Sequence, residues 1–235
     1  MRFQDAAPDA RAVVYAAIQA EPVVARAGTL LAEATSQQRV LARAVMNGQS
    51  EDPAAWRTMF PTLFAGGQRD PADQEAVLAR SEAILAVSLE VAARGDRVRD
   101  QVRGAVVEAL TQALLARRVP VSALRRERRI LFDGVRAEIH PYDVTVESPG
   151  AAEAYDCKWG ARGIKADVLH QLDDARTHAA AEDESVRVGL VVFDADRSCR
   201  VRLGRETAPV GGIGLVTIET LGRLASGERL DPAIA

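Results

Sequence analysis

The spacing of apolar residues changes along the chain, from a helical period in the first part to a mixture of periods in the second. Across residues 30–45, apolar positions recur three and four apart, which is typical of amphipathic helices. Asp52-Pro53 and Asp70-Pro71 each place an acid before a proline, an arrangement that predicts the start of a helix. We therefore predict a helical region over residues 1–93. It carries no chemical motif, so we expect it to serve in partner binding, sensing or oligomerisation.

Residues 94–235 are predicted to form a second domain that begins with a long helix over residues 96–118. Glu108 lies at the border of the buried face of this helix, where an acid points either into a site or into solvent. The apolar stripe of the helix recurs every four positions, at Val98, Val102, Val106, Leu110 and Leu114.

The elements after this helix alternate between strands and helices. Because residues 186–193 form an apolar run, they predict a buried strand. From residue 96 the order is helix, three strands, helix, strand, which predicts an α/β fold with a mixed sheet. The other elements are predicted as a strand at 130–132, a helix at 165–182, strands at 199–203 and 213–218, and a short helix at 220–225. In the helix at 165–182 the apolar period points Val168, Leu169, Leu172 and Ala175 inward.

A hairpin over residues 138–160 organises the second domain. Its two apolar runs are separated by residues 147–150, a cluster typical of turns. If the turn is centred between Pro149 and Gly150, residues whose numbers sum to 299 face each other across the hairpin. Asp143 then faces Asp156.

The hairpin brings two acids and a lysine together. Side chains two apart on a strand share a face, so Asp156 and Lys158 lie on the same side as Asp143, while Cys157 and Trp159 take the other side. Two facing carboxylates repel each other, and a divalent cation between them would remove that repulsion. The alternative is a solvated hairpin edge on which Lys158 is an ordinary salt-bridge partner of Asp156.

Charge is distributed unevenly over a chain whose net charge is -3. Residues 94–129 carry 10 arginines against 4 acids, whereas residues 130–235 carry an excess of acids. A basic stretch beside an acidic pocket suits an enzyme that acts on a polyanion, although arginines at solvated helix ends would give the same count. The expected nucleic-acid contacts are Arg125, Arg126, Arg128, Arg129 and Lys165.

The order of elements and the acids on it resemble the core of the PD-(D/E)xK nuclease superfamily, which has the restriction-endonuclease-like fold. The resemblance covers residues 96–196. The chain departs from the family pattern in reading Pro141-Tyr142-Asp143, and in having Asp156 where Glu is commoner before x-Lys.

The resemblance implies a role for each residue of the site. Asp143 and Asp156 would bind Mg²⁺, or Mn²⁺ in its place, together with the backbone carbonyl of Cys157. Lys158 would act on the attacking water. Glu108 matches the acid on the first helix and would be a further metal ligand of the catalytic site. Gln171 matches a polar residue that faces the site from the following helix, and it would also be catalytic.

The predicted activity is a Mg²⁺-dependent endonuclease that hydrolyses DNA, as a bacterial defence or DNA-processing effector. RNA is an alternative substrate. A catalytically inactive nucleic-acid-binding or assembly subunit is an alternative from another class. We expect either a homodimer or a partner protein bound to the helical region.

The sequence also bears on where in the cell the protein is expected to be found. No window approaches the roughly 18 to 20 apolar residues of a membrane span, and the first residues lack the apolar core of a secretory signal. Cys157 and Cys199 lack the spacing of metal ligands, so both are expected to be reduced and structural. The expected location is the cytoplasm, without contact with a membrane.

Overall fold

The structure is a computed structural model that describes residues 1–7, 10–65, 71–132, 134–136, 140–148, 151–206 and 211–233. The predicted turn at Pro149-Gly150, the first residues of the hairpin stretch (138–139) and the predicted helix start at Asp70 lie outside the described residues.

The chain forms two compact units. The sheet unit contains Met1–Ala10 and Thr111–Ala235, and the helical unit contains Arg11–Leu110. The first residues belong to the sheet unit because β1 (Arg2–Asp5) pairs antiparallel with β2 (Leu124–Phe132). The sequence pattern did not predict β1.

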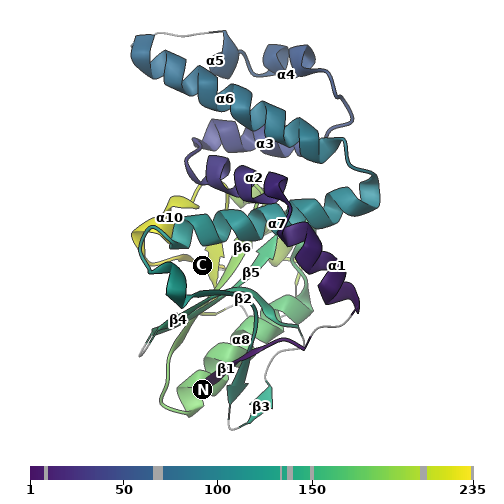
Figure 1. The fold of residues 1–235 in the computed structure, drawn as a ribbon. Helices are drawn as coiled ribbons and strands as arrows, with labels where there is room; N and C mark the ends of the chain where they lie inside the picture. Colours follow the sequence, from purple (N-terminus) through teal and green to yellow (C-terminus); the bar gives the residue numbers. More distant parts are fainter. Residues whose placement is uncertain are drawn as a thin grey trace. The chain divides into compact units, whose positions relative to one another are not determined.

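The helical unit consists of helices in the described residues, as the apolar period predicted (Figure 1). Leu31, Leu41 and Val45 are fully buried, and Gln38 on α3 donates to Ser81 Oγ on α6 at 3.0 Å. The helices before α7 are α1 (Ala10–Gln19), α2 (Pro22–Ala32), α3 (Ser36–Asn47), α4 (Pro53–Met59), α5 (Pro61–Phe64) and α6 (Pro71–Ala92).

Helix starts follow the local chemistry of the sequence. Thr35 forms a capping box with Gln38 at the start of α3, so that each side chain accepts a backbone N–H of the other residue. Asp52 caps α4 by accepting the N–H of Ala54 at 2.9 Å, with Pro53 at the first helical position. This confirms the predicted Asp-Pro start at residue 52.

The long helix α7 (Asp96–Leu115) carries the predicted stripe, and Val102, Val106, Leu110 and Leu114 are buried along it. Val98 is 40% exposed and is not part of the core. The helix stops three residues earlier than predicted, and the division between the two units falls within it, after Leu110.

The sheet unit is built on a mixed sheet with the strand order β1-β2-β4-β5-β6-β7-β8, and β3 (Val135–Arg136) pairs with β2 beside this path. Its pairs are antiparallel from β1 to β5, whereas β6 lies parallel to both β5 and β7. The remaining strands are β4 (Tyr142–Ser148), β5 (Ala151–Lys158), β6 (Val186–Val192), β7 (Gly214–Val216) and β8 (Asp231–Pro232). The α/β class with a mixed sheet is confirmed.

The register of the central hairpin follows the predicted turn. Val144 pairs with Tyr155 and Thr145 pairs with Ala154, so the residue numbers of each pair sum to 299. A slip of one residue would have turned every side chain of β5 to the opposite face. The register therefore puts Asp143 and Asp156 at facing positions, one step beyond the last ladder pair.

Strand β2 is longer than predicted. It begins at Leu124 rather than at residue 130, so the predicted basic stretch lies within the strand and not before it. Two of these arginines have polar partners within the protein, Gln112 for Arg126 and Glu147 for Arg128.

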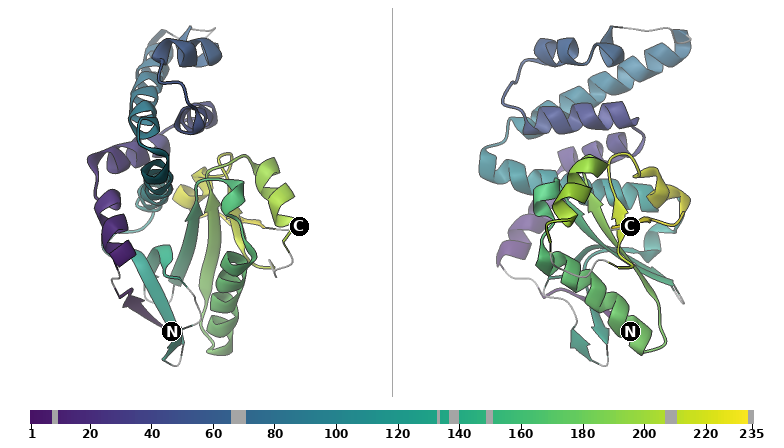
Figure 2. Two further views of the ribbon diagram at one scale, coloured as in Figure 1. Left: turned by 90° about the vertical axis from the view of Figure 1, so that its right-hand side faces the viewer. Right: turned by 180° about the vertical axis from the view of Figure 1, so that it is seen from behind.

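Helix α8 (Ala166–Ala181) covers one face of the sheet in both views of Figure 2. Leu169, Leu172 and Ala175 are fully buried and share a core with Leu190 and Val192 of β6. These inward positions are the ones that the apolar period predicted.

The predicted strand at 199–203 is wrong, because these residues lie in helix α9 (Asp196–Leu203). Cys199, Val201 and Leu203 alternate with arginines and so imitate a strand. In the structure Cys199 and Leu203, four residues apart, are fully buried, whereas Val201 is 53% exposed. That is the helical period.

The short segments near the C-terminal end complete the sheet unit. Strand β7 lies within the predicted residues 213–218, and α10 (Gly222–Ser226) takes the place of the predicted helix at 220–225. Among the described helices, none has the length and apolarity that a membrane crossing requires. Cys157 and Cys199 are both free and buried.

A buried ion pair joins the segment after α7 to β5. Arg118 binds Glu153 through both terminal nitrogens, at 2.9 Å for Nη1, and donates to the carbonyl of Leu224 at 2.7 Å. Tyr155 also donates to Glu153, at 2.6 Å. Burial alone would raise the pKa of Glu153, but the hydrogen bonds from Arg118 and Tyr155 outweigh it and hold the pKa below its usual value.

Replacing Arg118 with methionine is expected to lower the free energy of unfolding at neutral pH by about 3 kcal/mol. The variant leaves the buried carboxylate of Glu153 without the cation that hydrogen-bonds to it, and only Arg187, at 3.9 Å, remains as a neighbouring cation. In the wild type, the ion pair contributes fully to the free energy of unfolding above the pKa of Glu153 in the unfolded chain, about 4.3. This contribution is lost as pH falls through the lower pKa of Glu153 in the folded protein. The free energy of unfolding of the variant should therefore approach that of the wild type as pH falls, which urea titrations at neutral pH and near pH 4 would measure.

Arg200→Met, which removes an exposed partner of Asp196, is the matched control and should change stability by less than about 1 kcal/mol. A variant as stable as wild type at neutral pH would contradict the expectation.

Candidate active site

The structure brings Asp143, Asp156 and Lys158 together at one end of the central hairpin. Lys158 Nζ contacts Asp156 Oδ1 directly and lies 3.8 Å from Asp143 Oδ2. Asp156 is only 4% exposed, whereas the side chains of Asp143 and Lys158 are partly exposed. The carboxylates are therefore bridged by an ammonium group, and part of the group is open to solvent.

Asp143 is held by the backbone of the neighbouring strand. The ladder between β4 and β5 ends at the pair Val144 and Tyr155, and beyond it the N–H of Cys157 donates to Asp143 Oδ2 at 2.6 Å. A side chain thus replaces the backbone acceptor at this position. This bond fixes the orientation of the Asp143 carboxylate, which a free hairpin edge would not do.

Lys158 is a cation in this environment. Burial would lower its pKa, but the charges of Asp156 and Asp143 and the hydrogen bond to Asp156 outweigh burial and raise the pKa above its usual value. The side chain is also confined by the turn η2 (Ala161–Gly163): a Cβ atom added at Gly163 would lie 3.0 Å from Lys158 Cβ. The ammonium group is held in place from both ends of the side chain.

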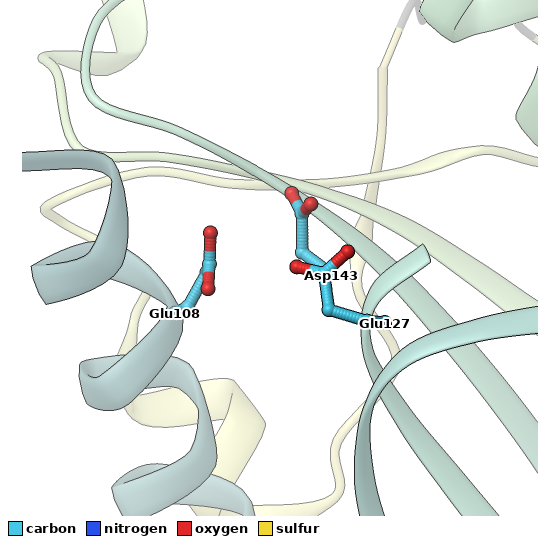
Figure 3. A group of neighbouring side chains, drawn as sticks. All are labelled: Glu108, Glu127 and Asp143. Carbon is cyan, nitrogen blue, oxygen red and sulfur yellow. The ribbon is translucent and has the colours of Figure 1, made fainter. Parts of the chain in front are cut away.

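Glu127 is a neighbour of Asp143 that the sequence pattern did not single out. The pairs on either side, Arg126 with Val144 and Arg128 with Tyr142, put Glu127 at the register position of Asp143. A carboxylate oxygen of Glu127 lies within 4.8 Å of one of Asp143, and Figure 3 shows both groups. Glu127 has a φ of 51°, a left-handed conformation that a residue with a side chain rarely adopts and that costs roughly 1–3 kcal/mol.

Glu108, which Figure 3 shows on α7, is buried. It is 2% exposed, and its carboxylate accepts hydrogen bonds from Tyr15 and, at 2.7 Å, from Gln19 Nε2. The sequence left open whether Glu108 points into a site or into solvent, and its burial shows that the solvent-facing alternative is wrong. Both hydrogen-bond partners belong to the helical unit, and the role of Glu108 as a metal ligand stays a prediction.

Gln171 on α8 uses its amide to hold the segment before β4. Its Oε1 accepts the N–H of His140 at 3.1 Å, and its Nε2 donates to the carbonyl of His140 at 3.0 Å. The hydroxyl of Tyr142 donates to the backbone carbonyl of Gln171. These bonds position the chain just before Asp143. A catalytic role for Gln171, as a residue that faces the site, stays a prediction.

The predicted nucleic-acid contacts lie in different surroundings. Arg128 is bound to Glu147 and Asp5, and Arg126 donates to Gln112 at 2.6 Å. Arg129 on the same strand is partly buried, whereas Arg125 on β2 and Lys165 before α8 are exposed. Contact of these residues with nucleic acid stays a prediction, and for Arg126 and Arg128 it would compete with partners inside the protein.

The carbonyl of Cys157, the fourth predicted metal ligand, belongs to β5, where Cys157 is paired with Val191 of β6. The sulfur of the same residue lies 3.4 Å from Thr111 Oγ1 in the buried interior. The side chain is therefore structural, as predicted. The backbone carbonyl as a ligand stays a prediction.

No protein-family model, curated protein or solved structure matches the chain. The resemblance to the PD-(D/E)xK nucleases accordingly rests on the element order and the site residues alone.

Proposed function

We propose that the protein is a Mg²⁺-dependent endonuclease with a restriction-endonuclease-like core in residues 96–196. The observation that supports this most directly is the convergence of Asp143, Asp156 and Lys158 at the end of β4 and β5. The order α7, β2, β4, β5, α8, β6 is also the order of that core, with the short β3 added.

The donor set fits a hard divalent cation. Asp143 and Asp156 offer carboxylate oxygens, Glu127 offers another close to Asp143, and Mg²⁺ prefers oxygen ligands while keeping several waters. When bound there, the ion would polarise a phosphate and supply a nucleophilic water. Mn²⁺ has similar ligand preferences, so we expect it to substitute.

Lys158 contributes a fixed positive charge. In the proposed reaction it lies beside the scissile phosphate and offsets the negative charge that develops in the transition state. Because the lysine is held by Asp156 and by the η2 turn, it need not reorganise during the reaction. Asp143 is oriented in the same way by the N–H of Cys157.

We further propose DNA as the preferred substrate and the helical unit as the part that senses a signal or binds a partner, in a defence or DNA-processing effector. The chain offers a basic strand for the phosphates, and RNA would present the same charges. A homodimer is the expected assembly.

Cleavage assays test this proposal. The full chain is incubated with supercoiled plasmid, single-stranded DNA and RNA, each with Mg²⁺, with Mn²⁺ and with EDTA. We expect nicking and linearisation of the plasmid with either metal and none with EDTA. A double variant, Asp143→Asn with Asp156→Asn, is purified in parallel to expose a contaminating nuclease. No cleavage of any substrate by the wild type, or equal cleavage by the double variant, would refute the proposal.

A second candidate function has its own support. The ammonium group of Lys158 and the N–H of Cys157 give Asp156 and Asp143 partners without any metal, as a structural cluster would require. A non-catalytic nucleic-acid-binding or assembly subunit would use the group in this way. It would bind nucleic acid in EDTA as tightly as in Mg²⁺ and cleave none.

A further inference from the structure

The edge of the sheet that carries Lys158 has a second group of charged residues. Strands β5 and β6 are parallel, so their carboxyl ends meet at the same edge, where ligands commonly bind in such sheets. The turn η2 follows β5, and helix α9 follows β6. These two segments face each other at this edge and enclose a pocket.

Both walls of the pocket are fixed by a buried carboxylate. Asp194, which is 6% exposed, accepts the N–H of Ala161 in η2 at 3.0 Å and the N–H of Ala195 just before α9 at 2.8 Å. A second link runs from Arg202 of α9 to the carbonyl of Ile164 after η2, at 3.0 Å. The pocket therefore keeps its shape without a ligand.

The pocket has a volume of about 330 Å³ and is lined mainly by arginines, with Ser198 among them. Arg202 is engaged with Glu206. Arg162, Arg197 and Arg205 are exposed, and no carboxylate of the described residues pairs with them. Three cations without a neutralising acid, set around one fixed pocket, make a site that suits an anion.

The pocket adjoins the proposed active site. The turn that supplies Arg162 is the one whose Gly163 lies against the stem of Lys158. A chain of phosphates that passes Lys158 would therefore have Arg162 nearby, with Arg197 on α9 and Arg205 after α9 across the pocket. On β2, by contrast, Arg126 and Arg128 are bound to partners inside the protein.

We propose that this arginine pocket, formed by Arg162, Arg197 and Arg205, binds backbone phosphates of the nucleic acid that the proposed nuclease cleaves. The inference rests on the proposed function and names the part of the surface that grips its substrate. One guanidinium group can donate two parallel hydrogen bonds to two oxygens of the same phosphate, which fixes the geometry of the contact. Because the contacts are to phosphates, they add affinity and do not read sequence.

The test measures binding in EDTA, where cleavage cannot occur. The full chain is titrated against a short labelled DNA duplex over a series of salt concentrations, and fluorescence anisotropy gives the slope of log affinity against log salt. The triple variant Arg162→Gln, Arg197→Gln, Arg205→Gln should reduce this slope by about 0.9 for each phosphate that the protein no longer neutralises, or roughly 2 to 3 in total. The three replaced side chains are exposed, so the variant should retain the thermal midpoint of the wild type.

A control variant has the same change in charge elsewhere on the sheet unit. Three exposed arginines serve for it: Arg2 on β1, Arg117 just after α7, and Arg229 just before β8. Replacing all three with glutamine should leave the salt slope at the wild-type value. An equal fall in both triple variants would mean that net charge alone is responsible, and would overturn the proposal.

The remaining outcomes separate this inference from the proposed function. A pocket variant with the wild-type slope would overturn the inference, while Mg²⁺-dependent cleavage by the wild type would leave the function standing. A reduced slope in the pocket variant, with no cleavage by the wild type under any metal, would support the pocket and refute the nuclease. If calorimetry finds that the wild type binds inorganic phosphate at these arginines but no nucleic acid, the pocket serves a small anion and the inference is wrong. Binding of neither ligand also overturns it.

Discussion

Replacing Asp143 with asparagine is expected to abolish Mg²⁺-dependent cleavage, with a loss greater than the roughly 10²–10³-fold that follows removal of one electrostatic stabiliser. The variant loses the negative charge that would hold the cation. The amide oxygen of asparagine can still accept the N–H of Cys157, which binds Asp143 at 2.6 Å in the wild type. The hairpin should therefore remain folded, with a thermal midpoint near that of the wild type.

The matched control is Asp174→Asn, which removes a carboxylate from the exposed face of α8. It should leave both cleavage and stability unchanged. Calorimetry with Mg²⁺ should show weaker binding in the Asp143→Asn variant alone. Wild-type cleavage by that variant would show that Asp143 is not a metal ligand, and a large fall in its thermal midpoint would show that the group is structural.

Replacing Lys158 with alanine is expected to lower the turnover number by about 10²–10³-fold, the scale for losing one preorganised electrostatic group. Metal binding and nucleic-acid binding should survive, because an ammonium group is a cation and supplies no ligand atom to the metal. The variant also leaves the buried carboxylate of Asp156 without its cation, which destabilises the fold. Turnover is therefore measured well below the thermal midpoint of the variant, in parallel with Mg²⁺ affinity and DNA affinity.

The sequence contains two lysines, and the second provides the control. Lys165 is exposed at the start of α8, so Lys165→Ala should keep the wild-type turnover number and lose at most some affinity for nucleic acid. If Lys158 only neutralises Asp156, the Lys158→Ala variant will cleave at close to the wild-type rate and bind Mg²⁺ more tightly. That result would refute its role in the reaction.

The central hairpin could be predicted because its register depends on one local turn. The position of Asp143 opposite Asp156 followed from that register, and the burial of Leu169 and Leu172 followed from the helical period of α8. These features depend on residues close in sequence, where pattern and turn chemistry are informative.

The features that escaped prediction depend on contacts distant in sequence or on backbone conformation. Strand β1 has four residues of mixed polarity, and its pairing partner lies more than a hundred residues away. Val201 on α9 is apolar yet exposed, which made a helix resemble a strand. Glu127 lies opposite Asp143 because β2 begins at Leu124, whereas the sequence pattern placed a strand only at residues 130–132, so the approach of these two acids could not be predicted.

The pairing of β1 with β2 has a consequence for synthesis of the protein. Ribosomes add about 5–20 residues per second, so β1 leaves the ribosome on the order of ten seconds before the residues of β2 are made. During that interval the helices of residues 11–110 can fold on local contacts, which form quickly. The strand Arg2–Asp5 is then the first part of the sheet unit to be made, and until β2 has been made its backbone has no strand to pair with.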